Sequence, residues 1–106
     1  MSDIFPDWYN PITTINSTAT VVSSTDSKVA LNKLGNRRYM RLTNLGPNTE
    51  FLAFKSVNAV KAVGLRLASG ETWESSIPLG NPITDTVSVI SSASATNQRL
   101  LKVECY

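Results

Sequence analysis

Histidine is absent from this chain of 106 residues, and cysteine occurs only once. Without histidine, neither a Ser-His-Asp triad nor a Cys-His pair can form, and no histidine can bind a metal. The single cysteine, Cys105, cannot build a zinc site or an internal disulfide. The scattered glycines Gly64, Gly70 and Gly80 do not form a dinucleotide or phosphate-binding loop. We therefore predict no catalytic residue, no metal site, no cofactor and no small-molecule substrate.

Charge and long apolar runs are also scarce. Charged residues make up 17% of the chain, against about 25% in an average domain, and the net charge is +2. The one local basic cluster is Arg37, Arg38 and Arg41, which is weaker than the basic stripe of a typical nucleic-acid binder. No apolar run is long enough for a membrane span, and the first residues lack a signal-peptide pattern. We expect a soluble protein made in the cytoplasm, with no membrane or nucleic-acid partner.

The chain does contain short segments in which apolar and polar residues alternate, separated by turn residues. In 38–43, Met40 and Leu42 fall on one face and Arg41 on the other, which is the period of a β-strand. Gly46 and Pro47 then supply turn chemistry. About eight such segments follow one another at a spacing of roughly ten residues, the pattern of a sandwich or barrel. The predicted strands are 17–25, 29–31, 38–43, 50–54, 63–67, 71–75, 86–90 and 99–106.

The fold class that this predicts is all-β: a single small β-sandwich or barrel, jelly-roll-like, with an extended N-terminal arm. For residues 56–63 the sequence allows either a single helical turn or a loop or twisted strand. The alanines favour a helix, whereas the β-branched valines and the following Gly64 favour a loop or strand. We expect Cys105 to be an inward-facing, inert thiol on the last strand. The predicted core consists of Met40, Leu42, Leu52, Phe54, Leu67, Val87, Val89, Leu101 and Val103.

Residues 1–16 form the predicted arm, and residues 17–106 form the predicted β-domain. Pro6 and Pro11 keep the arm out of regular structure. Two interpretations stay open: the arm packs over its own sheet, or it leaves the domain and docks on a neighbour. It carries the large apolar side chains Ile4, Phe5, Trp8 and Tyr9.

Three groups of polar or aromatic side chains deserve weighing as sites. Glu71 and Glu74 lie three residues apart on a strand, so they project to opposite faces and do not converge like a glycosidase pair. Aromatic residues such as Trp73 would stack on a sugar in a carbohydrate-binding module, although half-buried aromatics in a β-core are more common. The arginine cluster would bind phosphate groups in a nucleic-acid-binding barrel, or carboxylates of a protein partner. The simpler interpretation is that these arginines lie in solvent at the end of a strand.

The order of segments resembles a recurrent pattern in small virion proteins of tailed bacteriophages. The resemblance rests on the turn 41–47, the strand 50–54, the glycine-leucine-turn segment 64–71 and the Ser/Ala/Thr hairpin with its strand at 91–104. It spans about two-thirds of the chain.

This resemblance implies a structural β-domain of the virion, a capsid decoration (cement) protein that bridges neighbouring capsid subunits. Its partners would be the major capsid protein or other virion proteins, and the chain would form a homo-oligomer, a dimer or trimer. The alternatives are a head–tail connector or tail component, or a carbohydrate-binding β-module that stacks sugars on Tyr39, Trp73 or Trp8. The interface residues that we hypothesise are Ile4, Phe5, Trp8, Tyr9, Arg37, Arg38 and Arg41.

Overall fold

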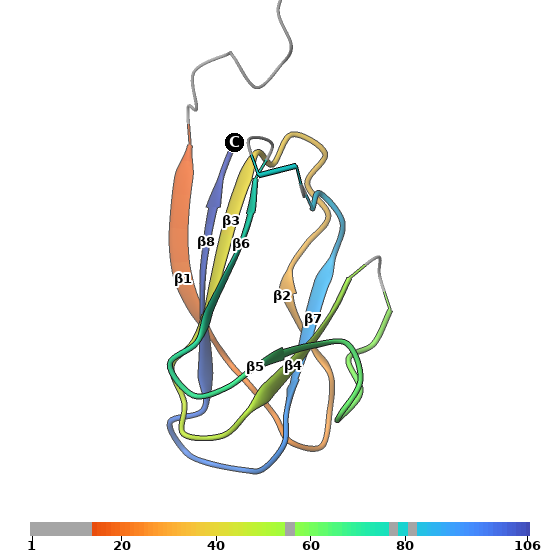
Figure 1. The fold of residues 1–106 in the computed structure, drawn as a ribbon, viewed down its shortest axis with the longest axis vertical. Coiled ribbons are helices and arrows are strands. Elements are labelled where there is room, and N and C mark those ends of the chain that lie inside the picture. The colour runs from red at the N-terminus through yellow and green to blue at the C-terminus, as the bar shows by residue number, and fades with distance from the viewer. Residues whose placement is uncertain (1–13, 55–56, 77–78, 81–82) are drawn as a thin grey trace, which may run out of the picture.

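A computed structural model describes residues 14–54, 57–76, 79–80 and 83–106, in which eight strands and no helix occur (Figure 1). Among these residues no helix has the length and apolarity that a membrane span requires. In chain order the strands are β1 (Ile15–Val21), β2 (Lys28–Leu31), β3 (Tyr39–Asn44), β4 (Glu50–Phe54), β5 (Leu65–Leu67), β6 (Thr72–Ser76), β7 (Val87–Ser91) and β8 (Arg99–Cys105).

The strands form two antiparallel four-stranded sheets, with the orders β1-β8-β3-β6 and β2-β7-β4-β5. The pairing runs from the ends of the chain inward: β1 with β8, β2 with β7, β3 with β6, and β4 with β5. Two further pairings, β3 with β8 and β4 with β7, complete the two sheets. A folded ribbon of this kind in two facing sheets is a jelly roll. The predicted all-β, jelly-roll-like sandwich is confirmed.

The alternation in β3 shows how the sequence produces a sheet with two different faces. Met40 and Leu42 are fully buried between the sheets, while Arg41 is exposed on the other side. On the facing sheet, Leu52 in β4 and Val89 in β7 lie opposite each other and are likewise fully buried. The core is therefore built from alternate residues of both sheets, as in other sandwiches.

Most of the predicted core is confirmed. Phe54 is only partly buried, but it packs against the core cluster. The predicted residues that are buried are Met40, Leu42, Leu52, Leu67, Val87 and Val89.

The prediction is wrong for Leu101 and Val103, which are half-buried and lie on the outer face of β8. The core-facing residue is their neighbour Leu100, which is fully buried. The alternation then puts Lys102 and Glu104 on the inner face as well. The sequence favours the wrong face because Leu101, Val103 and Cys105 form the more apolar set of alternate residues.

The ambiguous segment 56–63 contains no helix and no strand among its described residues, 57–63. It ends in a turn in which the N–H of Val63 donates to the carbonyl of Val60 at 3.1 Å, with Ala62 at a φ of 63°. Gly64 follows with a φ of 92°, and a Cβ there would lie 2.4 Å from the carbonyl oxygen of Leu52. Glycine is therefore required where this loop enters β5.

Strand β1 begins at Ile15, two residues before the boundary of the predicted arm. The predictions about Ile4, Phe5, Trp8 and Tyr9 lie outside the described residues.

Candidate interaction surface

The outer face of the β1-β8-β3-β6 sheet carries an apolar strip along its β1–β8 side. Ile15 and Val21 lie at the two ends of β1 and are 70% and 69% exposed. Register pairing places Ser17 opposite Val103 and Ala19 opposite Leu101, so the odd-numbered residues of both strands share this face. Leu101 and Val103 are half-buried. Two neighbouring strands thus offer a row of aliphatic side chains to contact.

The β3–β6 side of the same face is polar. The hydroxyl of Tyr39 donates to Glu74 Oε2 at 3.2 Å, and the hydroxyls of Thr43 and Thr72 lie 2.8 Å apart. Burial, followed by this hydrogen bond to Glu74, raises the pKa of Tyr39. Arg41 is exposed and lies between β8 and β6, opposite Val103 and Glu74. The face as a whole therefore combines an aliphatic strip with a polar, charged rim.

Cys105 is buried, as predicted, and burial raises the pKa of its thiol. Its alternation partners are Leu101 and Val103, which means that it lies on the outer side of β8 rather than facing the core, contrary to the prediction. It is opposite Ile15 on one side and Tyr39 on the other. A desolvated thiol with a raised pKa is a weak nucleophile.

The expectation of a solvated guanidinium is wrong for Arg37, which is 2% exposed. Its Nε donates to Glu104 Oε2 at 2.8 Å, and Nη2 donates to the carbonyl of Asn32 at 2.6 Å. Its Nη1 donates to the carbonyls of Ile83 and Asp85 at 3.2 and 3.1 Å. Arg37 therefore joins the β2–β3 connection, the segment before β7 and β8, and it is not available to a partner.

The three arginines of the cluster do not act together. Arg38 is half-buried, and its backbone N–H donates to the carbonyl of Cys105 at 2.9 Å. Of these three residues, Arg41 is the one that is exposed on the outer face of the sheet, which also carries the exposed Arg99 of β8. Sequence proximity suggested one basic patch, but the strand alternation and the ion pair of Arg37 separate the three side chains.

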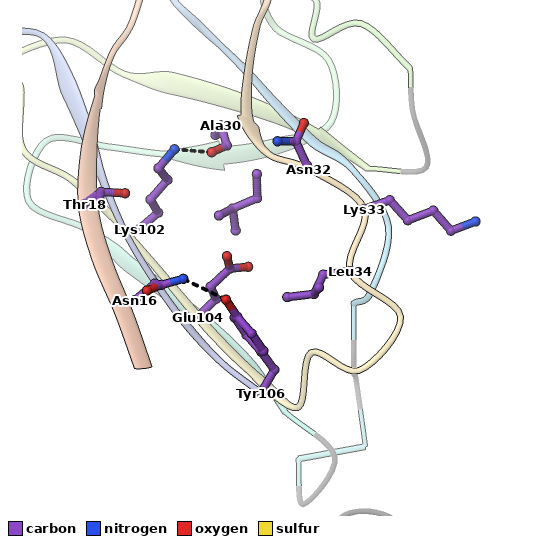
Figure 2. A pocket seen from close by; sticks show the side chains of 10 residues that line it. Asn16, Thr18, Ala30, Asn32, Lys33, Leu34, Lys102, Glu104 and Tyr106 are labelled. Atoms are coloured by element: carbon purple, nitrogen blue, oxygen red, sulfur yellow. Dashed lines mark hydrogen bonds between the residues drawn. The ribbon is translucent and has the colours of Figure 1, made fainter. Parts of the chain in front are cut away.

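A groove of about 390 Å³ lies on the inner side of β1 and β8, next to β2 and the residues that follow it. Figure 2 shows that Asn16, Lys102, Glu104 and Tyr106 point into it. Their polar atoms are already engaged: Asn16 Nδ2 donates to the Tyr106 hydroxyl at 3.0 Å, and Lys102 Nζ donates to the carbonyl of Ala30. Burial lowers the pKa of Lys102, although nearby Glu104 opposes the shift. The groove is polar, and Lys102 and Glu104 in its lining are bound within the chain.

A buried polar cluster lies at the opposite end of the sandwich, and no pattern in the sequence predicted it. Gln98 Nε2 donates to Glu50 Oε2 at 2.6 Å and to Asn44 Oδ1 at 3.1 Å, while Gln98 Oε1 accepts from the N–H of Asn48 at 2.9 Å. All three side chains of Asn44, Glu50 and Gln98 are fully buried. A Cβ on Gly46 would lie 2.4 Å from Gln98, so the glycine makes room for the cluster.

Glu50 is the unusual member of this cluster. Its Oε1 is buried without a hydrogen-bond partner among the described residues. Burial raises the pKa of Glu50 to about 7, with the hydrogen bond from Gln98 acting in the opposite direction. A carboxyl in this setting holds its proton close to neutral pH.

The other candidate site residues, Glu71, Glu74 and Trp73, contact other residues of the sandwich. Glu71 Oε1 accepts from the N–H of Ala68 at 2.6 Å, whereas Glu74 interacts with Tyr39, which confirms that the two carboxylates do not converge. The ring of Trp73 packs against Phe54, with centroids 5.4 Å apart, at the margin of the core. Trp73 is therefore a core aromatic and not an open stacking platform.

Within the part of the chain that the structure describes, no three acidic or cysteine side chains gather in a way that would hold a metal ion. Compared with protein-family models, curated proteins and solved structures, the chain gives no match.

Proposed function

We propose that this chain is a structural protein of a tailed-phage virion, a decoration protein that stabilises the head by bridging neighbouring capsid subunits. The observation that carries the proposal is the outer face of the β1-β8-β3-β6 sheet. There an aliphatic strip that includes Ile15, Val21 and Leu101 lies beside the exposed Arg41. An apolar surface with a polar rim, displayed on a well-packed sandwich, is typical of a protein-binding site.

The topology supports the same role by analogy. Jelly rolls recur in viral capsid domains, and also in lectins and cupins, so the fold favours the proposal without identifying a function. The first thirteen residues add further apolar side chains directly before β1, including Phe5 and Trp8. Many modest contacts of this kind, repeated over a symmetric shell, give strong overall attachment.

Binding to undecorated heads of the virus that encodes the chain tests the proposal. We expect Arg41→Glu to weaken binding at least tenfold, because it reverses an exposed positive charge next to the aliphatic strip. The matched control is Arg66→Glu, which changes an exposed arginine on β5 of the other sheet. Equal binding by both variants, or no binding of the unmodified chain, would reject the role of this face.

Copy number separates a decoration protein from a head–tail connector or tail component. Quantitative mass spectrometry of purified virions should find the chain in numbers comparable to the major capsid protein. A ratio of only a few copies per particle would favour the connector or tail alternative.

A further inference from the structure

Among the residues that the structure describes, strand β1 is a sheet edge without the usual protections against pairing. Natural edge strands are commonly short, bulged, or carry lysine, proline or another charge. Strand β1 has seven residues, of the sequence INSTATV, with no charge and no proline. It pairs with β8 in unbroken register from Ile15 opposite Cys105 to Val21 opposite Arg99. In Figure 1 it forms the outer margin of its sheet.

The other three edges of the sandwich are protected. Strand β2 has four residues, begins with Lys28 and has a register shift after Val29. Strand β5 has three residues, of which the middle one is Arg66. Strand β6 carries Glu74. The contrast with β1 indicates that this one edge is kept available for a partner strand.

The hydrogen bonds of β1 with β8 fix which backbone groups face away from the sheet. Thr14 and Tyr106 exchange two backbone hydrogen bonds, at 2.8 and 3.0 Å, and the N–H of Val22 donates to the carbonyl of Gln98 at 3.0 Å. In an antiparallel ladder the paired residues alternate, so the even-numbered residues of β1 bond to β8. The residues whose N–H and C=O point to the free edge are Ile15, Ser17, Ala19 and Val21.

We propose that β1 pairs antiparallel with β1 of a second copy of this chain, about a twofold axis at Thr18. In this register Ile15 lies opposite Val21 of the other copy, and Ser17 lies opposite Ala19. Each of these pairs exchanges two backbone hydrogen bonds. A shift by one residue would put outward-facing groups opposite inward-facing ones, and a shift by two would leave an end unpaired. The sheets of the two copies become one continuous sheet.

The side chains of β1 are self-complementary in this register. Ile15 and Val21, the two most exposed large aliphatic side chains of the strand, become neighbours across the twofold axis at both ends. On the inner face Asn16 lies opposite Thr20, and Thr18 lies opposite Thr18, which are hydrogen-bonding pairs. No two like charges meet, because β1 has none. An isologous interface requires this self-complementarity.

The facing sheet leaves room for the second copy. Strand β2, the nearest edge of that sheet, contacts β8 across the sandwich, and the inner side of β1 borders the open groove through Asn16 and Thr18. In the dimer, the grooves of both copies lie side by side along the twofold axis. The inference rests on β1 alone and does not depend on a role in a virion.

Light scattering after size-exclusion chromatography tests the dimer with the 106-residue chain. We expect twice the chain mass of 11.5 kDa, and we expect Ala19→Pro to give the single chain mass. Proline removes an N–H that bonds only to the second copy, so the sandwich itself should stay folded, although it loses the stabilisation that dimerisation adds. The matched control is Thr72→Pro on β6, whose N–H also points away from its sheet, because the neighbouring Glu71 bonds to Asn44. A monomer at high micromolar concentration would overturn the proposal.

Disulfide trapping tests the register. In a Cys105→Ser background, Thr18→Cys should form a covalent dimer rapidly under mild oxidation, because the two Cα atoms across the axis would be about 4.5 Å apart. Thr20→Cys is the control: four residues of offset separate its two copies by about 14 Å. Equal cross-linking of both variants, or none with Thr18→Cys, would reject this pairing.

Discussion

At the scale of single residues, two charged side chains that the sequence would place in water are buried for different reasons. Each nitrogen of the Arg37 guanidinium donates a hydrogen bond, to Glu104 or to one of three backbone carbonyls. Glu50 is only partly satisfied, because Gln98 and no other described residue binds its carboxyl group. Arg37 therefore connects three segments of the chain. Glu50 makes the free energy of unfolding depend on pH.

We expect the protein to become less stable as the pH rises from about 4.5 to about 7. The folded-state pKa of Glu50 is about 7 against an ordinary 4.5, so the folded state holds a proton that the unfolded state has lost between these values. The stabilisation by that proton is complete below pH 4.5 and is lost as the pH passes 7. Melting temperatures at pH 5 and pH 8 should differ by several degrees.

Glu50→Gln should remove most of this difference, because the amide does not ionise. Glu71→Gln, at an exposed turn position, should leave the pH profile unchanged. A profile that is the same in the unmodified protein and in Glu50→Gln would contradict the role of this carboxyl group.

At the scale of elements, β8 has two candidate core faces, and the structure uses the less apolar one. Leu100 is buried, but Lys102 and Glu104 follow it on the same face. These charged residues lie where the sandwich opens into the groove and find partners in Ala30 and Arg37. The more apolar face, with Leu101 and Val103, is turned outward and becomes part of the candidate interaction surface.

Truncation of β8 side chains should distinguish its two faces. Leu100→Ala should lower the free energy of unfolding by about 2–4 kcal/mol, since it leaves a cavity in a packed core. Val103→Ala removes a half-buried side chain and should cost less than about 1 kcal/mol. Urea unfolding measures both values. A larger loss for Val103→Ala than for Leu100→Ala would mean that β8 faces the other way.

At the scale of the whole molecule, the jelly roll leaves two surfaces of β1 for assembly: its free edge and its outer face. Residues 1–13 precede that strand in the chain, with Thr14 between them. A partner bound through the edge and a capsid subunit bound through the face would therefore both contact this side of the sandwich. We therefore propose that the first residues serve attachment rather than folding.

Deletion of residues 1–11 should leave the sandwich folded and abolish attachment to heads. Trp and Tyr are frequent anchors in interfaces, and each buried aromatic side chain contributes about 2–3 kcal/mol. Head binding and the melting temperature of the free protein are the two measurements. If the segment is instead a lid on its own sheet, the deletion will lower the melting temperature and leave binding unchanged.

The eight strands and the class of fold could be predicted from the sequence alone. Alternation and turn residues are local signals, so segments such as 38–43 and 50–54 correspond closely to β3 and β4. The composition alone excluded histidine chemistry and an internal disulfide. The absence of a long apolar run likewise matches a sandwich in which strands such as β3 bury alternate residues.

The face that β8 turns to the core, the burial of Arg37 and the cluster around Glu50 could not be predicted in this way. These features depend on contacts between residues far apart in the sequence, such as Arg37 with Glu104 and Glu50 with Gln98. The sequence pattern gives the period of a strand but not the strand that lies opposite it. The position of β1 at the edge of its sheet also depends on such contacts, because the order of the strands decides which of them lies at an edge.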